Sequence, residues 1–393
     1  MKRIILYINL LIISTTIASA NTVEEMIESV KANNLTLKAS EEATKSAIKN
    51  IKATNNLSNP EVGFEYHNGA NVDGDKYGLS ISQSFSWPGL YINRSKANKL
   101  KISIEESNLL AKRLEVLLNA KQLCIQIINF NKKIKSQTAV YNNVSQLYAE
   151  YEKGFNHGEI SILDINKLKI ELLNSKRVLD ELNALRTASL EELCAINGNV
   201  SVEYMATITE YPEQAIESID TYIAQIETFD PEYTSVQLSV DAAKRDVSIS
   251  KMGWLPEFSL GYNYTNEMGT KFNGLLVGVS VPVFSNKNKV SAAKSEQISA
   301  EITQKDILIT KEKSFKAIYA HIVTLKSQIH SYKNVLENGI NQTMLKKALN
   351  GGQISLLDYL LELRYFLEAE QSLLDLEFEY NTQLTDLNKY NLL

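Results

Sequence analysis

The chain contains the same seven-residue pattern twice, 194 positions apart. Residues 158–164 have the sequence Gly-Glu-Ile-Ser-Ile-Leu-Asp and residues 352–358 have Gly-Gln-Ile-Ser-Leu-Leu-Asp, so five of the seven positions are identical. Around each copy the order of segments is the same: a helical stretch, two strand-like runs, a very long helical stretch, this turn and a further helix. A period of roughly 195 residues is too long for a solenoid and indicates a two-fold duplicated unit.

The duplication predicts where the chain divides. We expect repeat one at 21–196 and repeat two at 213–393, joined by a linker at 197–212. The linker and the C-terminal tail should lie at the equator of the long axis, where half-length helices meet. Each repeat should contain one hairpin and one tip turn: hairpins at 61–86 and 257–284, and tip turns at 154–161 and 350–355.

Residues 1–20 are predicted to be a signal peptide. Lys2 and Arg3 precede an apolar run at 4–13, and Ala-Ser-Ala at 18–20 is a typical cleavage site. A retained anchor helix is the alternative, but the apolar run is short for a bilayer span of about 20 residues. Loss of Lys2 and Arg3 takes the formal charge from -5 to -7. Because the remaining sequence shows no basic run or stripe, we expect no nucleic-acid partner.

Two stretches predict unusually long helices. No proline or glycine interrupts 93–153, and only Gly339 interrupts 287–349. Helices of about 60 residues are on the order of 90 Å long. The second has apolar residues at alternating steps of three and four, a coiled-coil-like seam: Phe315, Ile318, Ile322, Leu325, Ile329, Tyr332 and Leu336. Four helices of about half this length, at 23–53, 161–195, 213–252 and 355–387, can pack end to end beside the long ones.

Each predicted hairpin has two runs that alternate apolar with small or polar residues. Runs of about 8 to 11 residues suit a tilted transmembrane strand, although a half-buried soluble sheet shows the same alternation. The export signal and the aromatic residues Trp87 and Trp254, placed as at a membrane interface, favour the membrane. Four strands cannot close a barrel, so other copies must complete it. Two copies supply 8 strands and three supply 12; the long helices favour three, because a wider tube leaves room for a water-filled lumen.

The only two cysteines, Cys124 and Cys194, lie at similar distances on either side of the predicted turn near His157. A disulfide between antiparallel helices is therefore geometrically possible in an oxidising compartment. Both also lie among apolar helix neighbours, where a free cysteine packs as a small core residue. The sequence leaves the two alternatives open.

The two turns have a direct physical interpretation. Gly158 and Gly352 allow the positive φ that a tight reversal requires. Ser161 and Ser355 are placed as helix N-caps, and Asp164 and Asp358 follow three residues later, where a carboxylate completes a capping box. Capping is thus one reason for these residue types.

Five motifs, in order and with duplicated spacing, resemble the TolC-type outer-membrane efflux proteins over nearly the whole mature chain. The motifs are Asn-Pro-Glu at 59–61, Ser-Gln-Ser-Phe-Ser-Trp-Pro-Gly at 82–89, Trp-Leu-Pro-Glu at 254–257, Val-Pro-Val-Phe at 281–284 and the paired turns. The second motif is most similar to the heavy-metal and cation efflux branch, although basic residues do not follow Pro88-Gly89 here.

This resemblance implies a mainly α fold with a small transmembrane β part. Duplicated long helical hairpins would form a trimeric α-barrel, and four strands per chain would complete a 12-stranded β-barrel. The implied location is the outer membrane of a Gram-negative bacterium, in contact with its lipid and extending into the periplasm. The implied partners are two further copies in a homotrimer, a periplasmic adaptor protein and, through the adaptor, an inner-membrane pump.

The resemblance also assigns roles to residues. The tip turns would dock the adaptor through Gly154, Gly158, Ser161, Asp164, Gly351, Gly352, Ser355 and Asp358. Asp358, with Glu362 on the next turn, would form a periplasmic gate sensitive to cations. Leu361 occupies the position where relatives often have a second aspartate.

The sequence contains no motif for catalysis or cofactor binding. There is no phosphate loop, nucleophile elbow, His-x-x-x-His or Cys-x-x-Cys pattern, and the four histidines are scattered. We therefore expect no enzyme, no cofactor and no metal site, but a passive channel subunit of a tripartite efflux or export system. The alternative is a periplasmic coiled-coil scaffold or adaptor without a membrane barrel. Whether a metal cation, a drug or a polypeptide passes is left open, as is whether the resting state is open or closed.

Overall fold

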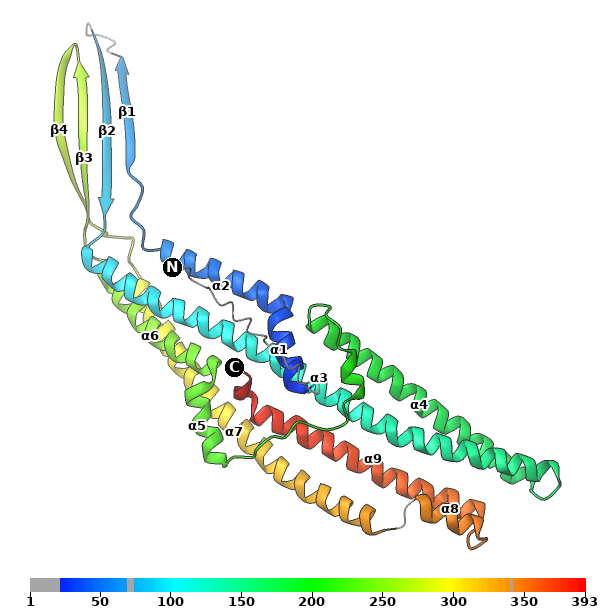
Figure 1. The fold of residues 1–393 in the computed structure, drawn as a ribbon. Helices are drawn as coiled ribbons and strands as arrows, with labels where there is room; N and C mark the ends of the chain where they lie inside the picture. The colour runs from blue at the N-terminus through cyan, green and yellow to red at the C-terminus, as the bar shows by residue number, and fades with distance from the viewer. Residues whose placement is uncertain (1–21, 69–73, 340–341) are drawn as a thin grey trace, which may run out of the picture. The chain divides into compact units, whose positions relative to one another are not determined.

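The computed structural model describes residues 22–68, 74–339 and 342–393. The predicted signal peptide lies outside the described residues. The chain is mainly helical and has one four-stranded sheet (Figure 1). The helices are α1 Val23–Asn33, α2 Leu35–Ala53, α3 Pro88–Asn156, α4 Ile162–Ile196, α5 Ile219–Phe229, α6 Pro231–Met252, α7 Lys289–Asn338, α8 Gln342–Asn350 and α9 Leu356–Leu387, with short 3₁₀ turns at Glu203–Thr207 and Lys389–Leu392. The strands are β1 Glu61–Asn68, β2 Asp75–Phe85, β3 Glu257–Glu267 and β4 Thr270–Ser280.

The sheet joins the two predicted hairpins in one antiparallel layer. Its strand order is β1-β2-β3-β4, and β2 pairs with β3 across the two halves of the chain. Ile81 of β2, for example, lies opposite Val62 on one side and Tyr262 on the other. The second hairpin was expected to extend to 284, but β4 ends at Ser280. Pro282 explains the earlier end, since proline has no N–H to offer a strand partner.

One long helix was predicted correctly and the other was not. α3 is a single helix of 69 residues. The expected helix at 287–349 is instead two helices, because α7 ends at Asn338 and α8 begins at Gln342. At Gly339 an added Cβ would lie 2.6 Å from the carbonyl oxygen of Val335, so the backbone there suits glycine alone. The rest of the connection lies outside the described residues.

Two of the four half-length helices are also divided. The stretch at 23–53 is interrupted at Asn34, whose side chain donates to the Ile196 carbonyl at 2.7 Å. The stretch at 213–252 begins only at Ile219 and is interrupted at Asp230, which caps α6. Pro231 follows as the first helical residue and disfavours helical backbone at the residue before it.

The described chain forms two compact units, and each takes segments from both predicted repeats. Unit one contains the described residues up to Asn34, Ala120–Glu213 and Asn334–Phe378. Unit two contains Leu35–Asn119, Gln214–Lys333 and Glu379–Leu393, and so includes the sheet. The repeat boundaries inferred from the sequence remain a prediction.

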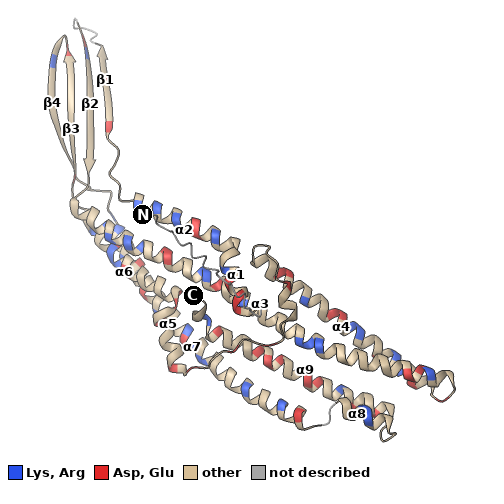
Figure 2. Cartoon of the chain, in the orientation of Figure 1, with Lys and Arg blue, Asp and Glu red and all other residues tan. Residues whose placement is uncertain are grey.

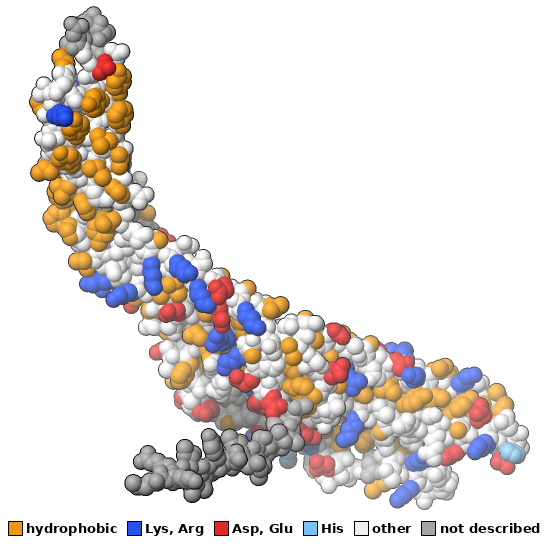
Figure 3. All heavy atoms as spheres, turned by 45° about the horizontal axis from the view of Figure 1, so that its top comes forward, with side chains coloured by type: hydrophobic (Ala, Val, Ile, Leu, Met, Phe, Trp, Pro, Cys, Tyr) orange, Lys and Arg blue, Asp and Glu red, His pale blue; other side chains and the backbone are white. Residues whose placement is uncertain are grey.

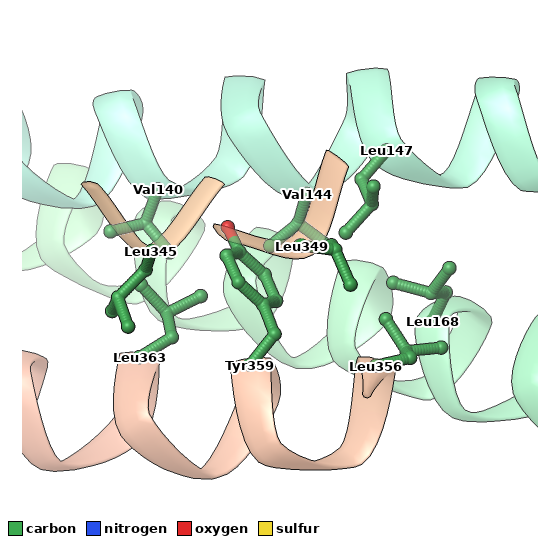
Figure 4. Close-up of a cluster of buried hydrophobic side chains, with 9 residues drawn as sticks. All are labelled: Val140, Val144, Leu147, Leu168, Leu345, Leu349, Leu356, Tyr359 and Leu363. Atoms are coloured by element: carbon green, nitrogen blue, oxygen red, sulfur yellow. The ribbon is translucent and has the colours of Figure 1, made fainter. Parts of the chain in front are cut away.

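Unit one has a core in which α3, α4, α8 and α9 meet (Figure 4). Its buried members are Val140, Val144, Leu147, Leu168, Leu345, Leu349, Leu356, Tyr359 and Leu363. Tyr359 is fully buried, and its hydroxyl accepts a hydrogen bond of 2.8 Å from Asn143 Nδ2. The single polar atom that enters this core is therefore satisfied, as a buried hydroxyl requires.

Unit two has a second core, which includes the first part of the predicted seam. Phe315, Ile322 and Leu325 of α7 are buried, and Phe315 and Ile322 pack with Tyr222 and Ile226 of α5 and with the C-terminal residues Leu384, Leu387 and Tyr390. Tyr332, farther along the seam, is exposed. None of the helices in the described part of the chain is both long enough and apolar enough to cross a membrane.

Candidate functional site: the sheet faces and the two turns

One face of the sheet is apolar and exposed. Because directly paired residues project from the same face, the register places these side chains together: Val62, Phe64, Tyr66, Tyr77, Leu79, Ile81, Phe85, Phe258, Leu260, Tyr262, Tyr264, Leu275, Val277 and Val279. Leu275 is 87% exposed and Phe64 is 70% exposed. Figure 3 shows hydrophobic side chains along much of the strand region. Such a surface is far more apolar than a soluble sheet normally leaves in water.

The opposite face is lined mainly by small and polar residues. One row across all four strands consists of Gly63, Ser80, Asn263 and Gly274. A second row, nearer the helices, consists of Ser84, Ser259 and Gly278. A sheet with one apolar and one small polar face matches the alternation of a channel barrel, whose outside faces lipid and whose inside faces water.

The sheet has two unpaired edges. β1 pairs only with β2 and β4 pairs only with β3 among the described strands. The unpaired N–H and C=O groups at these edges need partners wherever water is absent. The described sheet is therefore open at both edges.

The two tryptophans lie where the strands meet the helices. Trp87 stands between β2 and α3, and its ring centroid is 6.1 Å from that of Phe258. Trp254 stands between α6 and β3. The side chains are 42% and 48% exposed, respectively. The structure thus brings both to the same end of the sheet, the arrangement expected of an interfacial belt.

The two turns of the duplicated motif share one backbone geometry. Gly158 has φ +77° and Gly352 has φ +69°. In the first turn Glu159 N donates to Gly154 O at 2.9 Å, and in the second Gln353 N donates to Ala348 O at 2.9 Å. This is the Schellman end of a helix, in which a left-handed glycine satisfies the last carbonyl groups. Gly351, just before the second turn, still donates its N–H to Lys347 O at 2.9 Å, as in a regular α-helix.

The first turn is closed by Ser161 and Asp164. Ser161 Oγ accepts from Asp164 N at 3.2 Å and donates to Asp164 Oδ2 at 2.8 Å. Lys167 Nζ lies 3.2 Å from Asp164 Oδ1. The hydrogen bond from Ser161, followed by the contact with Lys167, lowers the pKa of Asp164. The carboxylate is therefore partly neutralised inside its own chain.

The second turn is closed by Ser355 and Asp358 in the same way but without a lysine. Ser355 Oγ donates to Asp358 Oδ2 at 2.6 Å, Ser355 N donates to the same oxygen at 3.2 Å, and Asp358 N donates to Ser355 Oγ at 3.1 Å. These bonds lower the pKa of Asp358. Across the described residues Asp358 has no cationic partner, and Glu362 on the next turn is exposed. The two turns thus share a backbone but differ in whether the capping aspartate has a lysine partner.

The remaining sequence predictions concern the two cysteines and a metal site. Cys124 and Cys194 are both free, so the structure contains no bridge between them. Burial raises the pKa of the Cys124 thiol to about 12, which makes it an inert core residue. No group of three or more His, Cys, Asp or Glu side chains within the described ranges could hold a metal ion.

Sequence analysis missed a buried charged cluster in unit two. Lys311 Nζ lies 2.7 Å from Asp230 Oδ2, and the Asp230 side chain is only 2% exposed. Glu232 also binds Lys311, at 2.7 Å. The sequence signal was Asp-Pro at 230–231, typical of a helix start, but it does not identify the lysine, which is 81 positions away.

The fold is similar to solved outer membrane channels. A membrane protein from Pseudomonas aeruginosa superposes with a TM-score of 0.78 and 14% identity, covering 94% of this chain and 93% of that one. The Campylobacter jejuni CmeC outer membrane channel gives 0.73 and 17%, covering 94% and 85%. The open state of the Neisseria gonorrhoeae MtrE outer membrane channel gives 0.70 and 12%, covering 94% and 88%. No protein-family model and no curated protein sequence matches the chain. The predicted fold, long helices plus four strands per chain, is confirmed.

Proposed function

We propose that this chain is a subunit of an outer-membrane channel, a passive exit duct across the periplasm and outer membrane of a Gram-negative bacterium. The observation that carries the proposal is the four-stranded sheet, with an exposed apolar face and two unpaired edges. The similarity of the fold to outer membrane channels supports it. In this proposal the energy for transport comes from an inner-membrane pump.

The same sheet supports a homotrimer. With four strands per chain, three copies supply 12 strands, an even number within the range of known bacterial barrels. Two copies would supply only 8, a barrel whose interior side chains fill. The row of Gly63, Ser80, Asn263 and Gly274 would then face an aqueous lumen.

The two turns are the proposed contact with a periplasmic adaptor protein, through which the channel meets an inner-membrane pump. Both present exposed carboxylates and backbone at the end of a helical hairpin. The residues proposed to dock the adaptor are Gly154, Gly158, Ser161, Asp164, Gly351, Gly352, Ser355 and Asp358. Asp358 and Glu362 are the proposed periplasmic gate.

A soluble periplasmic scaffold is the competing hypothesis, and the sheet argues against it. Leaving one Leu or Phe side chain in water instead of burying it costs about 1.5 to 3 kcal/mol. Fourteen apolar and aromatic side chains lie on one face, and no described element of the chain covers residues such as Phe64 and Leu275. Lipid on this face removes that cost.

The test is to purify the full chain from the membrane fraction and record from it in planar bilayers. We expect a detergent-stable trimer, seen by native mass measurement and by a heat-dependent shift on gels, and stepwise single-channel conductance. A monomer that stays in the soluble fraction and gives no conductance would support the scaffold instead. A monomer with its strands folded in detergent would contradict the shared barrel.

A further inference from the structure

Four helix ends adjoin the sheet. The end of α2 leads into β1, β2 leads into the start of α3, the end of α6 leads into β3, and β4 leads into the start of α7. All four belong to unit two. Polar contacts join them; for example, Asn98 Nδ2 donates to Ile51 O at 2.8 Å, Lys101 Nζ lies 2.9 Å from Asp246 Oδ2, and Asn286 Nδ2 donates to Ser250 O at 2.8 Å.

These helix ends are strongly basic, in a chain whose formal charge is -5. The segments 43–56, 86–104, 243–256 and 281–295 contain thirteen Lys and Arg residues and one acidic residue, Asp246. Three of the lysines form ion pairs: Lys45 with Glu42, Lys101 with Asp246 and Lys244 with Asp241. We call the thirteen residues the basic collar: Lys45, Lys49, Lys52, Arg94, Lys96, Lys99, Lys101, Lys244, Arg245, Lys251, Lys287, Lys289 and Lys294. Figure 2 shows Lys and Arg at the ends of these helices beside the sheet. Figure 3 shows basic side chains gathered next to the apolar strand region.

The collar contains a cavity of about 520 Å³ where β2, β3 and β4 meet the helices. Arg94 and Lys289 both line it, and neither forms an ion pair with any other described residue. Glu257 contributes one carboxylate, to which Ser86 Oγ donates at 3.1 Å. The charged side chains of the cavity therefore sum to one positive charge.

The same cavity has an apolar side. Trp87, Leu255, Val281 and Phe284 line it, and all four are exposed, Phe284 most of all. A ligand that fits must present an anionic group to the cations and an apolar portion to this rim. A nucleic acid or an acidic peptide satisfies only the first requirement, whereas a phospholipid satisfies both.

We propose that the basic collar binds anionic phospholipid headgroups of the leaflet that faces the helices, with one headgroup phosphate held between Arg94 and Lys289. The inference rests on the proposed channel function, because the apolar sheet must lie in a bilayer for the collar to meet its headgroups. Clusters of Lys and Arg immediately beside a membrane segment attract anionic lipid. The acyl chains pass from the cavity over Trp87, whose ring centroid lies 6.1 Å from that of Phe258 on the apolar face of the sheet.

Trp87 provides a direct readout, because the chain has only two tryptophans. In a Trp254→Phe background Trp87 is the sole tryptophan, and lipids with brominated chains quench its fluorescence on contact. The full-length trimer is placed in bilayers of phosphatidylethanolamine with either brominated phosphatidylglycerol or an equal amount of brominated phosphatidylethanolamine. We expect stronger quenching by the anionic lipid at equal mole fraction.

The decisive variant is Arg94→Gln combined with Lys289→Gln. One basic residue near an anionic surface is worth about 1 kcal/mol, equivalent to about fivefold in affinity. In the double variant the preference for phosphatidylglycerol over phosphatidylethanolamine should therefore be at least about fivefold weaker than in the parent. Lys169→Gln with Lys305→Gln is the matched control, since both residues are exposed, lie outside the collar and do not line the cavity. It should keep the full preference.

Conductance separates failure of this inference from failure of the channel function. A parent protein that conducts but shows equal quenching by both lipids, or a preference that survives in Arg94→Gln/Lys289→Gln, overturns the lipid site and leaves the channel intact. A parent protein that neither inserts nor conducts removes the premise, and Trp87 should then be quenched by neither lipid. If the control variant also loses the preference for phosphatidylglycerol, the preference depends only on the net charge of the protein, and the proposed site is overturned as well.

Discussion

The Tyr390 hydroxyl donates a hydrogen bond of 2.5 Å to Asp230 Oδ2, although the two residues are 160 positions apart. The same oxygen receives Lys311 Nζ at 2.7 Å, while Oδ1 caps α6 by accepting from Glu232 N and Tyr233 N. One carboxylate thus ties the start of α6 to α7 and to the C-terminal segment. Both oxygens are satisfied, which is the condition for burying a charge.

Asp230→Asn should destabilise the protein by about 3 kcal/mol, because removing one member of a buried ion pair leaves the other uncompensated. Glu232 still binds Lys311, which keeps the loss at the lower end of the range of about 3 to 5 kcal/mol that is typical of a broken buried ion pair. Urea unfolding of the full chain measures the change. The control is Asp180→Asn, which breaks an exposed pair with Lys176 and should have no measurable effect. Equal effects in both variants would contradict the role of the buried cluster.

The cluster also predicts how stability depends on pH. Burial acts to raise the pKa of Asp230, but hydrogen bonds from Lys311, Tyr390 and Tyr233 N outweigh it and leave the pKa below its usual value. The stabilisation is therefore present above the unfolded pKa, about 3.9, and is lost as pH falls through the lower folded pKa. For Lys311, burial acts to lower the pKa, and the bonds to Asp230 and Glu232 raise it. Its contribution is present below about pH 10.4 and is lost as pH rises through the folded pKa.

The measurement is unfolding free energy against pH for the parent and Asp230→Asn. The difference between the two should be constant from roughly pH 5 to 9 and should shrink below about pH 3.9, where the unfolded parent begins to bind a proton at Asp230 before the folded parent does. A difference that stays unchanged into strong acid would mean that the charge of Asp230 does not stabilise the fold.

The strand faces can be tested at neighbouring depths. Leu275 pairs with Tyr262 in the middle of the strands, and Asn263, beside Tyr262, projects from the polar face. If Leu275 faces lipid near the bilayer midplane, Leu275→Arg should cost about 2 to 4 kcal/mol. Asn263→Arg should instead change conductance and leave the trimer assembled. The yield of heat-modifiable trimer and single-channel recordings measure the two effects; equal tolerance would indicate a soluble sheet.

The strand register shows that the effect of an arginine should depend on its position along the strand. Val279 and Ser280, an obvious pair from alternation alone, lie at the end of β4 beside the helices, and Val279 pairs with Phe258. The cost of an arginine falls to about 0 to 1 kcal/mol near the membrane interface. Val279→Arg should therefore be much milder than Leu275→Arg, and the gradient itself is a check on the orientation of the sheet.

Local patterns predicted the features that local chemistry determines. Alternation identified the strands, and the spacing of Gly158, Ser161 and Asp164 identified a capped turn, because each depends on neighbours within a few residues. The continuous α3 was predictable for the same reason. The division of a helix at Asn34 was not, since its cause is a hydrogen bond to Ile196, 162 positions away.

Charge was the clearest failure of sequence reasoning. We expected no basic stripe outside the signal peptide, and no contiguous run exists. The collar is assembled from four segments of the chain. Within a segment the basic residues are separated by other residues, as Lys45, Lys49 and Lys52 are. The pairing of β2 with β3 and the contacts between the helices bring the four helix ends together. A spatial pattern of this kind has no linear signature.

The final prediction concerns the proposed gate and the difference between the two turns. Asp164 is paired with Lys167, whereas Asp358 has no cation partner among the described residues. If three copies bring Asp358 together at the periplasmic end, these uncompensated carboxylates should attract di- and trivalent cations. A trivalent cation added on the periplasmic side should then reduce conductance. Asp358→Ala should weaken the block strongly, and Asp164→Ala should weaken it less.

Planar-bilayer recordings of the two variants decide between a gate and a helix cap. Both substitutions remove a capping carboxylate bonded to serine, so the loss of the cap is matched. A third variant, Lys167→Gln, frees Asp164 from its lysine while keeping the cap; it should increase cation sensitivity if the first turn also reaches the axis. An unchanged block in Asp358→Ala would leave this aspartate as a helix cap and exclude it from the gate, because capping alone gives no reason for cation sensitivity to differ between the turns.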